Sequence, residues 1–358
     1  MILKDIIKKF DKSNIKAGDG LEKGNYPLYT CSPIINKYLN DYLYEDEALI
    51  ISTGGNFSMH YVNGKFNYST DCYVFNTDKY NLKYMYYYLL SKKDDINKMF
   101  RGAGLKHLNK NEFVMLNIKD ISLKEQCDIV NQLDKVNEMI ELRKKEIEKC
   151  NNLIKSQFVE MFGDPVSNIK KWEKRRLFDK CEIITGNTPS RKIEAYYGDY
   201  IEWIKSDNIV EDKTYLSKAK EHLSIEGLKI GRYVPENCIL MTCIAGSLKS
   251  IGNVAITDRM VSFNQQINGI NPKGNNVYFM YEQFILSKEY LHTPVNMSLK
   301  GILSKNQLGN LEFIFPPIEL QNKFGKIFEQ IDKQKFEFEK NLKKLEELQV
   351  SLMQEYFG

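Results

Sequence analysis

Amide, hydroxyl and cationic side chains gather on stretches that carry turn residues rather than helical periodicity. Asn and Gln can pair bidentately with adenine, while Lys and Arg meet phosphates. Such residue types predict nucleic-acid reading from loops rather than from one recognition helix. In the second half of the chain the candidate DNA-binding residues are Thr185, Asn187, Thr188, Ser190, Arg191, Lys192, Lys205, Ser206, Asn208, Asn264, Gln265 and Gln266.

The amides at 264–266 are the leading base-reading candidates in that set. The same residues are equally typical of a polar strand end or a turn that caps its own backbone. Three further cations, Lys249, Lys300 and Lys305, are candidates for phosphate contacts or are simply solvated charges. Both alternatives stay open for each of these groups.

The first half of the chain offers a comparable set, selected largely by its alignment with the second half. For any one of these residues a solvent-exposed loop position is an alternative, and the repetition in two copies supports the DNA-binding interpretation. The set consists of Ser52, Thr53, Asn56, Lys65, Lys106, His107, Asn109 and Lys110.

Signatures of catalysis are missing from the sequence. Pro316–Ile318 lacks the flanking residues of an adenine methyltransferase motif, and no GxxxxGK[ST] phosphate loop is present. The four histidines, His60, His107, His222 and His292, have no metal-ligand spacing. We therefore expect no catalytic residue, no metal and no cofactor in this chain.

An internal repeat organises the chain that carries these loops. A shift of 195 positions aligns residues 108–163 with 303–358 without a gap, and 12 of the 56 pairs are identical. Gln126/Gln321 and the final Phe-Gly pairs are among them. Chance gives roughly a third of that number, so a duplicated unit is predicted.

The shared part of the repeat predicts two long helices. Each begins at a start signal, ISLKEQ in the first copy and PPIELQ in the second, and each ends at Phe-Gly. Apolar residues on alternating 4- and 3-residue steps indicate the seam of a coiled coil, and forty helical residues extend about 60 Å. The seam is predicted at Ile129, Leu133, Val136, Ile140, Ile147, Ile154, Phe324, Phe328, Ile331, Phe338, Leu342, Leu345 and Leu352. Packing of each helix on its own globule alone is the alternative.

Strand-rich sequence precedes each helix. In the first copy we expect strands at 26–30, 48–52 and 72–75, with turns at Gly54-Gly55 and Asn63-Gly64. In the second copy we expect strands at 183–185, 200–204, 238–242 and 253–256. A helical run follows the strands in each copy, at 82–90 and 277–286. The fold class is therefore α+β, with two mixed α/β domains separated by two long helices that form an antiparallel coiled coil.

Charge and cysteine usage add a weaker constraint. The helical segments 123–162 and 318–357 each carry seven basic and eight acidic residues, so the rest of the chain holds a net +6. That surplus lies where a polyanion would be met. Seven cysteines without a CxxC pair, no apolar run of membrane length and no secretory signal indicate a reducing cytoplasm.

Several motifs resemble the specificity subunits of type I restriction–modification systems. ITGNTPS at 184–190 with IEWIKSDNI at 201–209 resembles the opening of many target recognition domains. PPIELQ at 316–321 is similar to the entry of the spacer helix, and LKGILSKNQL at 299–308 to the segment before the final strand. The first globule departs from this pattern, with AGDGLEKGNYPLYTCS at 17–32 in place of a TGxTP loop.

The resemblance implies a domain plan and a division of labour. Residues 1–120 and 164–315 correspond to two target recognition domains, and 121–163 and 316–358 to two spacer helices. The subunit reads an asymmetric bipartite target in double-stranded DNA for two adenine methyltransferase (M) subunits, which use S-adenosylmethionine. Two restriction (R) subunits join in complexes that also cut.

Two other classes of function remain. One is a coiled-coil scaffold or interaction protein without DNA specificity, whose binding would ignore salt. The other is the specificity portion of a fused restriction–methylation enzyme. The duplicated frame, which runs from residue 1 to Phe357-Gly358, disfavours that second alternative.

Overall fold

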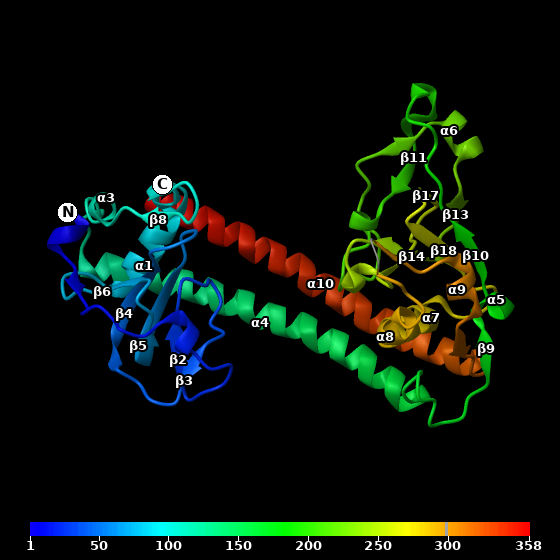
Figure 1. Cartoon of the computed structure of the whole chain (residues 1–358), viewed down its shortest axis with the longest axis horizontal. Coiled ribbons are helices and arrows are strands. Elements are labelled where there is room, and N and C mark those ends of the chain that lie inside the picture. The colour runs from blue at the N-terminus through cyan, green and yellow to red at the C-terminus, as the bar shows by residue number, and fades with distance from the viewer. Residues whose placement is uncertain (298–299) are drawn as a thin grey trace. The chain divides into compact units, whose positions relative to one another are not determined.

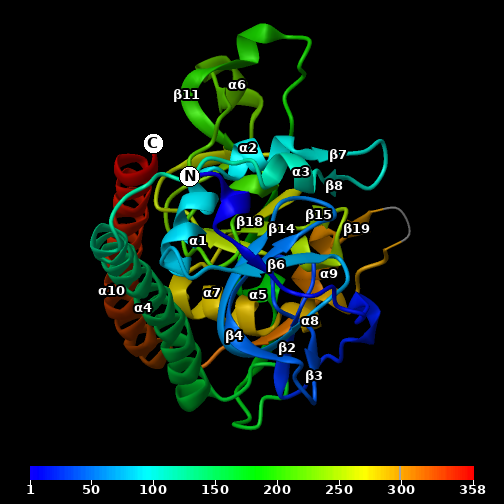
Figure 2. The same cartoon turned by 90° about the vertical axis from the view of Figure 1, so that its left-hand side faces the viewer.

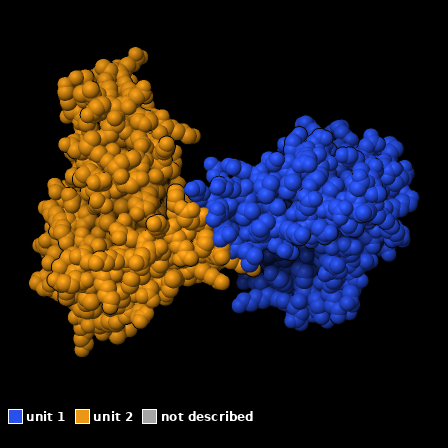
Figure 3. Space-filling view, turned by 180° about the vertical axis from the view of Figure 1, so that it is seen from behind, with its two compact units in different colours: residues 1–144, 340–358 blue, residues 145–339 orange. Residues whose placement is uncertain are grey.

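The computed structural model describes residues 1–297 and 300–358, which divide into two compact units (Figures 1 and 3). Unit 1 contains residues 1–144 and 340–358, and unit 2 contains residues 145–339. Two long helices, α4 (Leu123–Phe162) and α10 (Ile318–Phe357), contribute one part to each unit. Among the described residues, no helix combines the length and apolar character that crossing a membrane requires.

Unit 1 is a mixed α/β domain built on a six-stranded sheet of order β1-β6-β4-β5-β2-β3. Helix α1 packs between this sheet and α4, because Tyr84 and Met85 share one apolar core with Leu49, Phe75 and Leu133 (Figure 2). The elements are β1 (Lys8–Lys9), β2 (Tyr26–Tyr29), β3 (Tyr38–Leu39), β4 (Tyr44–Ser52), β5 (Met59–Tyr68), β6 (Cys72–Asn76), α1 (Leu82–Ser91), α2 (Lys93–Lys98), β7 (Phe100–Arg101), β8 (His107–Leu108) and α3 (Lys110–Phe113).

Unit 2 repeats this plan with two four-stranded sheets, of order β10-β18-β14-β16 and β12-β11-β17-β13. Helix α7 packs the first sheet against α4 and α10 through Phe279, Phe158 and Phe324. The elements are β9 (Lys174–Arg176), α5 (Leu177–Lys180), β10 (Glu182–Thr185), β11 (Tyr197–Ile204), β12 (His222–Leu223), α6 (Ile225–Ile230), β13 (Tyr233–Val234), β14 (Ile239–Thr242), β15 (Ile244–Ala245), β16 (Val254–Ile256), β17 (Val261–Phe263), β18 (Ile267–Asn271), α7 (Val277–Leu286), α8 (Lys288–His292), β19 (Gly301–Ile302), α9 (Lys305–Asn310) and β20 (Glu312–Ile314).

The ends of α4 follow its sequence signals. Ser122 and Glu125 form a reciprocal cap, in which Ser122 Oγ accepts from Glu125 N at 3.2 Å and Ser122 N donates to the Glu125 carboxylate at 2.9 Å. Gly163 ends the helix with φ of 78°, a conformation that favours glycine. Helix α10 begins directly after Pro316-Pro317.

The two long helices run antiparallel in each unit. In unit 1, Tyr356 of α10 donates to Gln132 of α4 at 2.6 Å, and Gln349 of α10 donates to Asn137 of α4. Residue numbers therefore increase along α4 in the direction in which they decrease along α10. All predicted seam residues are buried or half-buried. The fully packed ones are Leu133, Val136, Ile140, Ile154, Phe324, Phe328 and Ile331. The predicted antiparallel coiled coil is confirmed.

Two equivalent glutamines join the long helices to the domains. Gln126 Oε1 accepts from Asn81 N at 2.8 Å, and Gln321 Oε1 accepts from Asn276 N at 3.0 Å. Each glutamine also donates through Nε2 to a carbonyl before its own helix, Ile121 O at 2.9 Å and Pro316 O at 2.8 Å. Asn81 and Asn276 cap the N-termini of α1 and α7. The repeat thus preserves one buried hydrogen-bond set in both copies.

One turn prediction is wrong. Asn63-Gly64, a strong hairpin signal, lies inside β5, where Asn63 pairs with Glu47 and Gly64 with Asp46 of β4. The β4–β5 connection instead follows Ser52 and contains Gly54-Gly55, as predicted. The long ladder that pairs β4 with β5 from Tyr44 to Ile51 outweighs the local preference.

The domain boundaries stay a prediction, since the compact units divide both long helices.

A cavity of about 240 Å³ lies in unit 2 between α4, α7 and α10. Glu282 of α7 lines it and is 5% exposed. Burial raises the pKa of Glu282 to about 7, although Lys155 and Lys335 oppose the shift. In the first copy, the residue 195 positions earlier is Tyr87, whose hydroxyl donates to Asp134 of α4 at 2.5 Å. The second copy therefore has a buried carboxyl where the first has a bonded phenol.

Replacing Gln321 by Ala removes two hydrogen bonds of a buried side chain and leaves Asn276 N and Pro316 O unpaired. We expect the free energy of unfolding to fall by about 2 to 3 kcal/mol. Urea unfolding followed by circular dichroism measures this change. Gln330→Ala, at an exposed position of the same helix, is the matched control and should be nearly neutral. Equal effects of the two substitutions would contradict the anchoring role.

Replacing Glu282 by Gln should stabilise the protein at alkaline pH. The folded-state pKa is raised from 4.5 to about 7, so wild-type stability falls as pH rises through this range and the loss is complete above 7. We expect a gain of up to about 3 kcal/mol at pH 8 and almost none near pH 4.5. Urea midpoints at pH 5 and pH 8 test this expectation. Glu289→Gln, at an exposed site of α8, should show no such pH dependence.

Candidate nucleic-acid interface

Two candidate segments of unit 2 meet at one edge of a sheet. β10 and β14 end at Thr185 and Thr242, and β18 begins at Ile267. The register pairs Thr185 with Asn268 and Thr242 with Ile267, so these strand ends lie side by side. The loop 185–192 and the turn 264–266 therefore leave the same edge, as a reading surface requires.

The first part of the loop 185–192 is fixed by its own polar groups. Thr185 Oγ1 donates to Asn268 Oδ1 at 2.7 Å. Asn187 donates to Ile230 O at 2.9 Å and accepts from Arg232 N at 2.9 Å. These two predicted contact residues build the loop, because both ends of the Asn187 amide are already used. Thr188 lies further along, is exposed and donates to Gln265.

The amide cluster at 264–266 divides into a structural and an exposed part. Asn264 is 6% exposed, accepts from Gln266 N at 3.0 Å and donates to Gln266 Oε1 at 3.1 Å. The turn therefore caps its own backbone, which was the alternative for this segment. Gln265 projects from the turn and is exposed; its Oε1 accepts from Thr188, and its Nε2 is directed to a base edge in the DNA-reading hypothesis.

The cations of this surface have different surroundings. Arg191 and Lys205 both pair with Glu221. Ser190 and Lys192 are exposed, and no ion pair of Lys192 is found within 1–297 and 300–358. Ser206 is half-buried beside Lys205.

Asn208 is a structural residue of this segment rather than a free amide. It is 8% exposed and accepts from Lys205 N at 3.0 Å. It also donates to Ser217 Oγ at 3.2 Å. Its amide also donates to Lys218 O at 3.1 Å, so its polar atoms hold this segment together, and its role in DNA binding stays a prediction.

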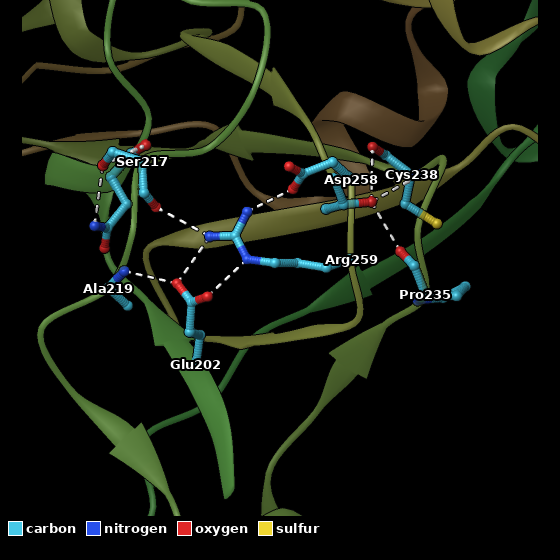
Figure 4. A network of polar contacts seen from close by, with 9 residues as sticks. Glu202, Ser217, Ala219, Pro235, Cys238, Asp258 and Arg259 are labelled. Atoms are coloured by element: carbon cyan, nitrogen blue, oxygen red, sulfur yellow. Dashed lines mark hydrogen bonds and ion pairs between the residues drawn. The ribbon is translucent and has the colours of Figure 1, made fainter. Parts of the chain in front are cut away.

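A network of half-buried side chains holds the segment 217–221 under this surface. Arg259 makes a bidentate ion pair with Glu202, with Nε at 2.6 Å and Nη2 at 2.8 Å from the carboxylate oxygens. Glu202 also accepts from Ala219 N at 2.7 Å, and Arg259 donates to Ser217 O at 3.3 Å (Figure 4). The pKa of Glu202 lies below its ordinary value, and the hydrogen bonds from Arg259 are the main cause. Both charges stay ionised and fix the segment against β11.

The three further cations lie around a second strand pair. β15 pairs with β19, with Ala245 opposite Gly301, which brings Lys300 beside the segment that carries Lys249. Lys249 forms an ion pair with Glu211 at 3.3 Å. Lys305 is exposed at the start of α9. Leu299, the first residue of the family-like segment at 299–308, lies outside the described residues.

Unit 1 has a corresponding sheet edge. β4 ends and β6 begins there, with Ser52 opposite Cys72. Leu108 N donates to Thr53 O at 2.9 Å and Gly55 N donates to Lys106 O at 2.9 Å, so the two predicted segments meet. Asn56, Lys106 and His107 are exposed at this edge.

Several predicted residues of unit 1 do not project from this edge. Ser52 and Thr53 are buried, and their hydroxyls donate to Asn56 O at 2.9 Å and Asp71 O at 2.8 Å. Asn109 caps α3. Lys110 is exposed and lies over the ring of Tyr73.

Lys65 is the member of this set that the structure separates from the others. It is paired opposite Glu45 of β4, far along the ladder from Ser52. Its ammonium lies over the ring of Tyr42 at 4.4 Å.

Three residues of this surface were not predicted. Trp203 donates through Nε1 to Asn187 O at 3.2 Å, and Arg232 donates to Thr185 O at 2.8 Å. Glu221 forms ion pairs with two cations, Arg191 and Lys205. The tryptophan inside IEWIKSDNI was the available signal, whereas an acidic residue gives no signal for a polyanion site.

The structure is a duplication in which each mixed α/β domain presents polar sheet-edge loops and is anchored to one of two antiparallel helices. The family model described as the type I restriction modification DNA specificity domain matches residues 1–152 and 169–349. This chain belongs to that family.

Curated relatives are specificity subunits of type I restriction enzymes. HindI from Haemophilus influenzae is 28% identical over 169 residues, which are 44% of this chain and 36% of that protein. MjaIX from Methanocaldococcus jannaschii is 28% identical over 195 residues, which are 52% of this chain and 44% of that protein. The matched region thus spans about two fifths of the length of these relatives.

Solved structures share the fold. The S subunit of a type I restriction–modification system from M. genitalium superposes with a TM-score of 0.66 at 15% identity, covering 99% of this chain and 94% of that one. A chain from a study of assembly and conformational transition of the type I system gives 0.56 at 14% identity, covering 100% and 96%. At these identities the likeness concerns the fold alone.

Gln265→Ala and Lys192→Ala should have different effects on DNA binding. Loss of a base contact at Gln265 should cost about 1 to 3 kcal/mol on the target and relax selectivity at one base pair. Loss of the Lys192 charge should weaken target and unrelated duplexes alike and lower the salt slope by about 1. Fluorescence anisotropy over a salt series measures both. A uniform loss of affinity for Gln265→Ala would exclude its base-reading role.

Proposed function

We propose that this chain is the DNA-recognition subunit of a type I restriction–modification complex. Each unit reads one half of a split, asymmetric target in double-stranded DNA. The chain brings two adenine methyltransferase (M) subunits to that target and, where the complex also cuts, two restriction (R) subunits. S-adenosylmethionine is bound by the M subunits, and this chain carries out no catalysis.

The observation that carries the proposal is the pair of polar sheet edges, one in each copy of a family-matched duplication. The edges differ in residue content: Asn56, Lys106 and His107 project from one, and Gln265 and Lys192 from the other. Two unlike reading surfaces support an asymmetric target, because identical surfaces would read identical half-sites. Exposed amides and cations on such an edge provide direct base readout and phosphate contacts.

A methylation map provides the test. The chain is co-expressed with the M subunit encoded beside it, and N6-methyladenine is mapped by single-molecule sequencing. We expect a split asymmetric motif with a fixed gap that disappears when this gene is removed. A control strain carries the Gln265→Ala chain, which should relax the motif in one half only. Methylation that persists unchanged without this gene would refute the proposal.

A further inference from the structure

Glu221 is an acidic residue at the centre of a surface proposed to meet a polyanion. Its carboxylate pairs with Arg191 at 2.5 Å and with the ammonium of Lys205. The side chain of Glu221 is 33% exposed and that of Arg191 is 56% exposed, so solvent reaches the cluster. A carboxylate in this place opposes DNA binding unless its position serves the binding itself.

Trp203 forms a platform under this cluster. Its side chain is buried, and its ring lies 5.3 Å from both the Arg191 guanidinium carbon and Lys205 Nζ. The ring of Tyr197 supports Arg191 from 4.7 Å. Because the aromatic faces hold both cations in place, the cations keep their positions when the carboxylate leaves.

The backbone that carries Glu221 is equally fixed. Glu221 O accepts from Trp203 N at 2.9 Å. Two residues earlier, Ala219 N donates to Glu202, which forms a half-buried ion pair with Arg259 (Figure 4). The Glu221 side chain, which is 33% exposed, therefore extends from a hydrogen-bonded backbone.

The electrostatics keep this carboxylate ionised. Lys205 and then Arg191 hold the pKa of Glu221 below its ordinary range, against the effect of burial. At neutral pH the charges of Arg191 and Lys205 are thus partly neutralised within the protein. A phosphate must displace the carboxylate to use both of them.

We propose that Glu221 is a specificity-determining residue, whose carboxylate occupies Arg191 and Lys205 in place of a DNA phosphate until a correctly seated target displaces it. This inference rests on the proposed DNA-reading function. Non-specific binding depends almost wholly on phosphate neutralisation, so a built-in competitor weakens it most. Target binding has base contacts in addition and can offset the displacement.

Glu221→Gln in the full chain tests the idea. The amide keeps the shape and a hydrogen-bond acceptor but loses the charge. We expect binding to unrelated duplexes to tighten roughly 3- to 10-fold at 100 mM salt, with a salt slope steeper by about 1 to 2. The ratio of target to non-specific affinity should fall. Fluorescence anisotropy between 50 and 200 mM salt, with thermal melts of each variant, provides the readout.

Asp179→Asn is the matched control. It also removes one carboxylate paired with an arginine, Arg176 at 2.9 Å, but on α5 of the same unit. Glu221→Asp retains the charge and should restore most of the discrimination. The proposal requires the Gln variant alone to change the salt slope.

Four outcomes would overturn the proposal. Equal slopes for the Gln and Asn variants would indicate a general charge effect. Weaker binding of Glu221→Gln to all duplexes would mean that Glu221 positions Arg191 rather than competing for it. A wild-type chain that binds no DNA would refute the proposed function and this inference together. A wild-type chain with a methylation motif but an unchanged Gln variant would refute this inference alone.

Discussion

A buried glutamine at the start of each long helix connects that helix to its mixed α/β domain. Gln126 and Gln321 each bond the N–H of a capping asparagine on one side and a carbonyl of the helix entry on the other. The first bond fixes the direction of α1 or α7, and those helices support the sheets from whose edges the polar loops emerge. Because both ends of each buried glutamine amide are used, a shift of either element would leave a buried polar group unpaired.

The long-range organisation was readable from the sequence because it repeats and has a period. A gapless shift of 195 residues and a 4/3 apolar spacing predicted both helices, their antiparallel pairing and the seam. The Asn63-Gly64 turn could not be predicted correctly, since the ladder between β4 and β5 overrides a local preference that is visible in two residues. The anchoring role of Gln126 and Gln321 needed the structure, although their identity was visible in the repeat.

The candidate interface was predictable in its segments and less so in its side chains. Loops that leave neighbouring strand ends had to lie together once the sheet formed, and they do. Which polar side chains face outward depends on which of them must hydrogen-bond backbone groups of the loops. The amides of Asn187, Asn208 and Asn264 make such bonds, whereas Gln265 is exposed. Residue type alone cannot distinguish an asparagine that stabilises the loop backbone from one whose amide is exposed for a ligand. Glu221 was missed for the opposite reason, because its charge has the sign of the ligand.

The unlike residues at one repeat position, Tyr87 and Glu282, bear on how such domains can be exchanged between relatives. The Tyr87 hydroxyl donates to Asp134 and accepts from Asn137. The first domain therefore depends on the identity of two residues in the first four turns of α4. Glu282, at the equivalent position, instead shares a cavity with Lys155 of α4 and Lys335 of α10. A crossover at the domain edge would separate the phenol from its partners, whereas one placed beyond Asn137 would carry them together. A domain exchange that preserves these contacts therefore has to include α4 as far as Asn137.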